Sequence, residues 1–115
     1  MRNFRELDVW KDSINLVKEV YLLIEKLPDS EKFGLRSQIS RCVVSISANI
    51  TEGSANDSQK YFVRFLQISL GSAFELETHI IICKELSFIS IADENILNEK
   101  INILKKRINA LMKYS

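Results

Sequence analysis

Residues that interrupt helices and strands are scarce in this chain, whose 115 residues include one proline and three glycines. Strands in small domains are joined by frequent turns rich in these two residues, so their scarcity favours a few long helices. Pro28 and Gly53 are the interruptions that separate apolar segments, whereas Gly71 lies inside one. The sequence therefore predicts an all-α fold.

Apolar residues recur at intervals of three and four in four segments, which predicts helices at about 8–27, 30–52, 58–87 and 93–113. Asp8 is expected to cap the first helix and Pro28 to end it, and Gly53 is expected just past the end of the second. Short connections make successive helices antiparallel neighbours. The prediction is an antiparallel up-down-up-down four-helix bundle in which residues 1–115 form a single domain.

Two adjacent apolar rows make a wide apolar face on the first helix. The seam of three-four spacing is Trp10, Ile14, Val17, Tyr21 and Ile24, and a second row lies beside it, Leu16, Val20, Leu23 and Leu27. The fourth helix has the most regular heptad seam: Leu97, Ile101, Leu104, Ile108 and Leu111. Phe4 and Leu7 are predicted to form a short arm that folds onto an adjacent surface.

The segment from Leu35 to Gly53 is apolar on one side and small on the other, which favours neighbours on both sides and a subunit interface. If the following turn is centred near Ala55, Gly71 lies level with residues 37–41, and close backbone contact there would explain a glycine inside a helix. The same register predicts an ion pair from Arg36 or Arg41 to Glu75.

Composition does not indicate a class of binding partner, since the net charge is only +1. No apolar run is long enough for a membrane span and no signal-peptide pattern is present, so a cytoplasmic protein is expected. Cys42 and Cys83 lie in apolar helical patterns without a CxxC unit. Buried reduced thiols are expected, and a bridge between them is the alternative.

A metal site has one candidate set, Glu75, His79 and Cys83, which stand four residues apart along one helix. A di-iron bundle needs a second Glu-x-x-His helix, and a mononuclear site lacks a fourth ligand, so His79 is interpreted as a polar residue near a helix edge. No catalytic residue, nucleotide motif or cofactor is predicted, because the single histidine shares its helix with Cys83 and no Walker or Rossmann glycines occur.

The end of the second helix carries a polar cluster that includes Asn49, Glu52 and Gly53. Helix-capping and loop hydrogen bonds explain it, and a role in lining a shared surface of an assembly is the alternative.

Charge divides between the two ends of the predicted bundle. Residues 1–14, 48–66 and 102–115 carry nine positive and five negative side chains, a net +4, whereas residues 22–38 and 75–99 carry four and nine, a net −5. The plain explanation is that the fourth helix has acids at its start and bases at its finish, which suits its dipole. In a ring, all copies of the basic end would lie on one face and attract phosphates. The candidates for nucleic-acid contact are Lys60, Arg64, Lys105, Lys106, Arg107 and Lys113, with Tyr61 and Tyr114 as stacking partners.

Nearly the whole chain resembles the ribosomal-RNA intervening-sequence proteins, relatives of the accessory variability determinant of diversity-generating retroelements. Residues that carry the resemblance are Phe4, Leu7, Trp10, Pro28, Glu31, Gly34, Leu35, Gln38, Ile39, Arg41, Ser45, Ile46, Asn49, Ile50, Glu52, Gly53, Phe65, Gly71, Ser72, Ala73, Glu75, Leu76 and Glu77. The chain departs from the pattern at Ser47, where proline is common, at Cys42 and Thr51, where alanine is common, and at Ser87, where glycine is frequent.

The resemblance implies a four-helix bundle without established catalytic residues that assembles as a homo-oligomeric ring, typically a pentamer. It also implies that the retroelement relative binds nucleic acid and a reverse transcriptase through basic surface. We therefore expect binding of RNA or DNA without sequence selection. The alternative is an interaction scaffold that recruits a protein partner, such as a polymerase, without nucleic-acid contact. From their positions in the predicted helices, we interpret Arg41, Asn49, Glu52, Gly53, Gly71 and Glu75 as structural or assembly residues.

Overall fold

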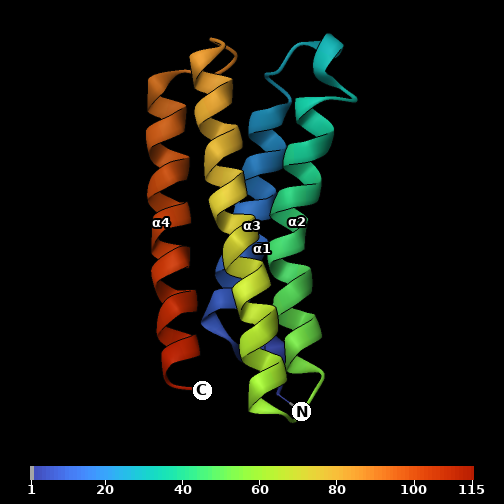
Figure 1. The fold of residues 1–115 in the computed structure, drawn as a ribbon. Coiled ribbons are helices and arrows are strands. Elements are labelled where there is room, and N and C mark those ends of the chain that lie inside the picture. The colour runs from blue at the N-terminus through green and yellow to red at the C-terminus, as the bar shows by residue number, and fades with distance from the viewer. Residues whose placement is uncertain (1) are drawn as a thin grey trace.

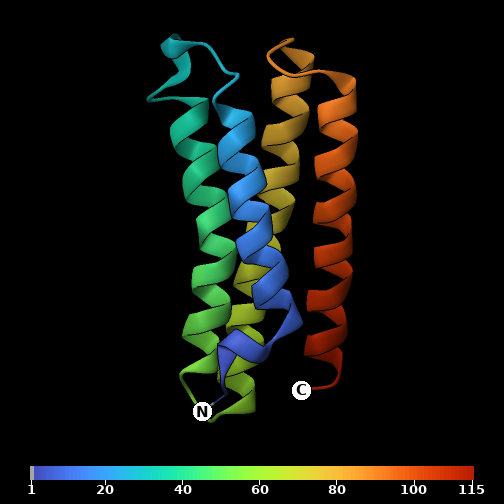
Figure 2. The same ribbon diagram turned by 180° about the vertical axis from the view of Figure 1, so that it is seen from behind.

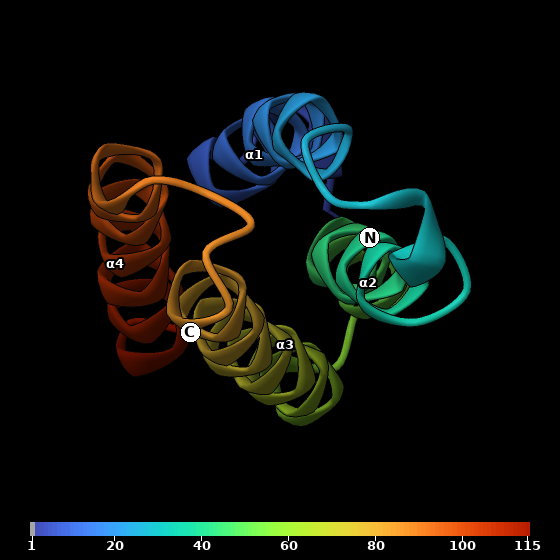
Figure 3. The ribbon, with the colours of Figure 1, turned by 90° about the horizontal axis from the view of Figure 1, so that it is seen from above.

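The computed structural model describes residues 2–115, which form four antiparallel α-helices in an up-down-up-down bundle (Figure 1). The helices are α1 (Asp8–Ile24), α2 (Leu35–Ser54), α3 (Gln59–Glu85) and α4 (Ile91–Lys113), with short 3-10 turns η1 (Phe4–Glu6) and η2 (Asp29–Glu31). Viewed along the bundle, the helices follow one another around the core in chain order (Figure 3). The predicted all-α architecture is confirmed.

The start of α2 differs from the prediction. Residues 29–31 form η2, and α2 begins only at Leu35, after Gly34, whose φ of −101° and ψ of −110° lie outside the helical region. Helix α1 likewise ends at Ile24, before Pro28, and Asp8 is its first residue rather than its cap. At the other junction Ser58 does cap α3, accepting a hydrogen bond from the Tyr61 N–H at 3.3 Å.

Gly53 lies inside α2, which continues to Ser54, so its predicted place beyond the helix end is wrong. A Cβ at Gly53 would lie 2.9 Å from Cβ of Phe65 and 3.3 Å from Cδ1 of Phe62. Glycine is therefore required because α2 and α3 approach each other closely before the turn between them.

The core confirms the seam of α4 and most of the wide apolar face of α1. On α4 the residues Leu97, Ile101, Leu104 and Ile108 are buried, and Leu111 is partly buried. On α1 the second row, Leu16, Val20 and Leu23, is buried and is continued past the helix by Leu27. Of the first row, Ile24 is buried, Trp10 and Val17 are partly buried, and Tyr21 is 46% exposed. The two rows are equally apolar in sequence, so the positions of α2 and α4 decide which of them lies deeper.

Buried serines bring α1, α2 and α3 close together. Ser47 donates a hydrogen bond to Ser13 Oγ at 2.8 Å, Ser13 donates to the Trp10 carbonyl at 2.7 Å, and Ser69 donates to the Ile46 carbonyl at 2.9 Å. The hydroxyl groups are thus satisfied, which removes most of the cost of burying them.

The N-terminal arm folds onto the end of the bundle, as predicted. The Arg2 N–H donates to the Ser54 carbonyl at 3.0 Å, and the Phe4 ring meets Trp10 edge-on with centroids 5.3 Å apart. The arm and the C-terminus lie at the same end of the molecule (Figure 2). In the described part of the chain, no helix combines the length and apolarity that crossing a membrane requires.

Candidate assembly and nucleic-acid surfaces

The register between α2 and α3 is shifted by about one helical turn from the predicted one. Ser72 accepts a hydrogen bond from the Cys42 thiol at its carbonyl (3.0 Å) and bonds Ser45 through its hydroxyl (2.9 Å). Gly71 to Ala73 therefore lie level with residues 42–45 rather than 37–41, because α2 extends to Ser54 and the turn comes later than Ala55.

The predicted ion pair from Arg36 or Arg41 to Glu75 is absent. Arg36 faces Asp29, 3.8 Å away, and Glu75 lies 3.4 Å from Nε2 of His79, one turn along α3. Arg41 is exposed and makes no ion pair within residues 2–115. The two helices place Arg41 at about the level of Glu75, but Arg41 is exposed, whereas its neighbour Cys42 is the residue that faces α3.

Gly71 also differs from expectation, since nothing lies within 4 Å of the position its Cβ would take. Close contact with α2 is therefore not its reason within one protomer. Asn49 is satisfied by Ser45, donating to its carbonyl at 2.8 Å, and exposed Glu52 has no partner in the described part of the chain. The outer face of α2 and α3 thus combines an open glycine with unpaired charges.

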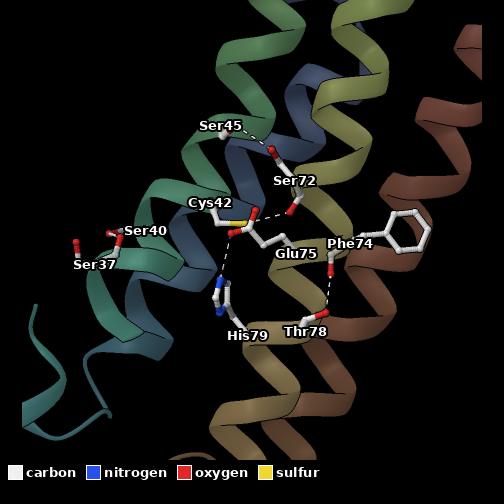
Figure 4. A network of polar contacts seen from close by, with 9 residues as sticks. All are labelled: Ser37, Ser40, Cys42, Ser45, Ser72, Phe74, Glu75, Thr78 and His79. Atoms are coloured by element: carbon white, nitrogen blue, oxygen red, sulfur yellow. Dashed lines mark hydrogen bonds and ion pairs between the residues drawn. The ribbon is translucent and has the colours of Figure 1, made fainter. Parts of the chain in front are cut away.

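His79 is more buried than expected, with 9% of its surface exposed. It lies between α2 and α3 with Nε2 toward Glu75 and with Nδ1 buried and unpartnered (Figure 4). Cys83 is separately buried in the core. Within residues 2–115, no three His, Cys, Asp or Glu side chains are placed to share a metal ion.

Both cysteines are free and buried, as expected. Burial, with a smaller contribution from the negative charge of Glu75, raises the pKa of Cys42 to about 12. Burial also raises the pKa of Cys83. Because the thiolate is the reactive form, neither residue has the character of a nucleophile at neutral pH.

The predicted basic residues lie in the first turns of α3 and in the second half of α4, and the start of α3 and the finish of α4 lie at the same end of the bundle (Figure 1). Two of them are engaged within the bundle. Lys105 has only 13% of its side chain exposed, because its Nζ lies 3.1 Å from Glu77 Oε2 and 4.2 Å from the centre of the Phe74 ring. Arg107 donates to Asp12 of α1. Both charges are neutralised by a partner on the neighbouring helix.

Four basic candidates remain exposed and without an ion pair within residues 2–115: Lys60, Arg64, Lys106 and Lys113. Lys60 and Arg64 line a shallow hollow of about 440 Å³ at the start of α3. Of the two tyrosines, Tyr114 is 82% exposed, whereas Tyr61 packs on Phe65 with ring centroids 4.8 Å apart. Tyr114 is therefore the freer stacking surface.

The acidic partners Glu77 and Asp12 were not identified from the sequence. The sequence does contain a pattern that points to Asp12. Asp12, Glu19 and Lys26 are charged residues spaced by seven, and Asp93, Lys100 and Arg107 have the same spacing. Charged residues at matching seven-residue spacings on antiparallel neighbours indicate cross-helix pairs.

Comparison with known proteins agrees with this architecture. A family model described as 23S rRNA-intervening sequence protein matches residues 5–110. A crystal structure of a protein of unknown function from the S23 ribosomal protein family of Bacteroides thetaiotaomicron superposes with a TM-score of 0.82 at 25% identity, over 91% of this chain and 95% of that one. No curated protein matches the chain.

Proposed function

Because the chain belongs to the 23S rRNA-intervening sequence protein family, we propose that it is a non-enzymatic, cyclic homo-oligomer that binds RNA or DNA through its basic end. A pentamer is the stoichiometry we propose, and the binding is without sequence selection. The observation that carries the proposal is the set of four basic side chains without an ion pair within residues 2–115: Lys60 and Arg64 at the start of α3, and Lys106 and Lys113 in the second half of α4.

Cyclic assembly increases the effect of these charges. A ring places every copy of the basic end on the same face, so that a chain of phosphates meets several clusters at once. The outer face of α2 and α3 is the surface we assign to assembly. Its support is unpaired Arg41 and Glu52, the open position at Gly71, and the exposed side chains of Val44 and Ile68.

Light scattering tests the assembly. The protein should have the mass of a pentamer at micromolar concentration, and Ile68→Glu should reduce that mass by placing a charge in the contact between copies. A matched variant is Ile81→Glu, on α3 with similar exposure, which should leave the mass unchanged. A monomeric wild-type protein would refute the ring.

A salt titration tests nucleic-acid binding. Affinity for generic single-stranded RNA and DNA should fall steeply with salt, and the double variant Lys60→Glu/Arg64→Glu should weaken binding and reduce the salt dependence by about one logarithmic unit per lost phosphate contact. Lys32→Glu/Lys84→Glu makes the same charge change at the opposite end of the bundle, before α2 and at the end of α3, and should bind like the wild type. Absence of binding even at low salt would refute the nucleic-acid role and leave the protein-scaffold alternative.

A further inference from the structure

A groove between α1 and α4 runs along much of the bundle. Three hollows of about 470, 460 and 250 Å³ follow one another in it, and adjacent hollows share lining residues. Arg107 borders the first two, and Glu19 and Lys100 border the second and third. The ion pairs of Arg107 with Asp12 and of Lys100 with Glu19 thus divide one groove into three compartments.

The compartments are apolar between these ion pairs. Leu16 and Leu104 of the core lie at the bottom of the middle one, and Ile103, 45% exposed, forms its wall. The hollow of about 250 Å³, called the upper compartment from here on, has Leu22 and Ile96 on its walls. Leu22 is 68% exposed and Ile96 is 55% exposed. This apolar surface is covered by no segment of the described chain.

The spacing of the compartments matches an α-helix. The ion pairs that separate them are seven residues apart, which is two helical turns or about 10.5 Å. A helix that lies along the groove presents one side chain to it every seven residues. Successive compartments can therefore each bind one apolar side chain from successive heptads of that helix.

The charges beside the groove specify the charges of that helix. Lys18 borders the middle compartment, and Lys106 stands three residues after its wall residue Ile103, so the two lysines flank it; both are exposed and have no ion-pair partner among the described residues. Glu25 and Glu99 stand three residues after Leu22 and Ile96 of the upper compartment, and both are exposed and equally unpaired. A complementary helix is acidic over the two lysines and basic over the two glutamates.

A neighbouring copy in the proposed ring does not meet this requirement. All copies in a ring point the same way, so the basic end of one copy would meet the basic half of the next copy's groove. We propose that the α1–α4 groove binds an amphipathic helix of a partner protein, with apolar residues at heptad spacing and a charge gradient opposite to that of the groove. This proposal goes beyond nucleic-acid binding and uses only the common orientation of the copies in the ring.

The test uses a fluorescein-labelled synthetic helix of about 20 residues, with leucines at heptad spacing, glutamates in the half that covers the lysines and lysines in the other half. A second peptide exchanges the glutamates and lysines. Fluorescence anisotropy should show at least about tenfold tighter binding of the first peptide. Leu22→Glu and Ile103→Glu should each weaken that binding about tenfold or more, whereas Ile81→Glu, on α3 and outside the three hollows, should not.

Circular dichroism melting verifies that each variant is folded, which is expected because the substituted side chains are exposed. Equal affinity for the two peptides, no binding of either, or an equal loss in Ile81→Glu would refute the proposal. A change in the protein's own mass in Ile103→Glu would also refute it, because the groove would then belong to a contact between copies. Nucleic-acid binding is measured separately, so either proposal can fail alone.

Discussion

Lys26, two residues after the end of α1, is ion-paired with Asp93 of α4, with Nζ 3.0 Å from Oδ2. Stepping seven residues back along this segment and forward along α4 gives the pair Glu19 and Lys100, and a further seven gives Asp12 and Arg107. The polarity is reversed at the first pair, where α4 supplies the acid. A slip of one heptad in one direction would therefore place Glu19 opposite Asp93, and a slip in the other would place Lys26 opposite Lys100. Only the observed register pairs opposite charges throughout.

These three ion pairs form a ladder between α1 and α4. Reversing one charge in the ladder should destabilise the bundle, and reversing its partner as well should restore stability. Glu19→Lys places two bases opposite each other, and because both side chains are partly exposed we expect a loss of about 0.5–1 kcal/mol in the free energy of unfolding. The double variant Glu19→Lys/Lys100→Glu should recover most of that loss. Urea unfolding of the wild type, both single variants and the double variant measures the coupling; additive effects would contradict it.

Acid should weaken the ion pair between Lys26 and Asp93. The hydrogen bond from Lys26 lowers the pKa of Asp93, and bonds from Ser90 act in the same direction. Because the carboxyl is more acidic in the folded state, its stabilisation is present above the unfolded value of about 3.9 and is lost as pH falls through the folded value. The stability difference between wild type and Lys26→Met, below about 1 kcal/mol, should therefore shrink as pH falls below the unfolded value. Urea unfolding across this range checks it, and a constant difference would assign the effect to packing.

Two glycines should respond oppositely to the same substitution. A Cβ at Gly53 would approach Cβ of Phe65 to 2.9 Å, so Gly53→Ala should cost about 1–3 kcal/mol by forcing α2 and α3 apart. Gly71 has open space around its Cβ position, so Gly71→Ala should stabilise the protomer by up to about 1 kcal/mol through helix propensity. Thermal unfolding compares the two, and light scattering shows whether Gly71→Ala alters assembly. A destabilising Gly71→Ala with unchanged mass would contradict this assignment.

The sequence predicted those features that depend on one helix at a time. Heptad spacing identified the buried row of α4. The sequence was insufficient for features that depend on a neighbouring element. It does not show which apolar row of α1 lies deeper, because that depends on the positions of α2 and α4. It also does not show where α2 begins, because that depends on the backbone conformation of Gly34.

The candidate surfaces show the same limit. A count of charges at one end treats Lys105 like Lys106, but only the packing of α4 on α3 reveals that Glu77 neutralises the former. The sequence could therefore show where basic residues concentrate along the chain, and the structure was needed to identify the four of the six candidates that have no ion pair within residues 2–115.

Replacement of Ser87 by glycine should stabilise the protein. It follows α3 with a φ of 63°, in the left-handed region that side chains other than glycine rarely adopt. The conformation is held by hydrogen bonds from the Ser87 N–H to Lys84 and from the Phe88 N–H to Cys83, each 2.9 Å, which end the helix in a Schellman motif. Ser87→Gly keeps these bonds and removes the Cβ contact with the backbone, so the free energy of unfolding should rise by about 0.5–1 kcal/mol. Ser87→Ala retains that contact and should give no comparable gain in the same thermal unfolding experiment. If glycine stabilises no more than alanine, the left-handed backbone is not strained, and the serine that replaces the family's frequent glycine carries no cost.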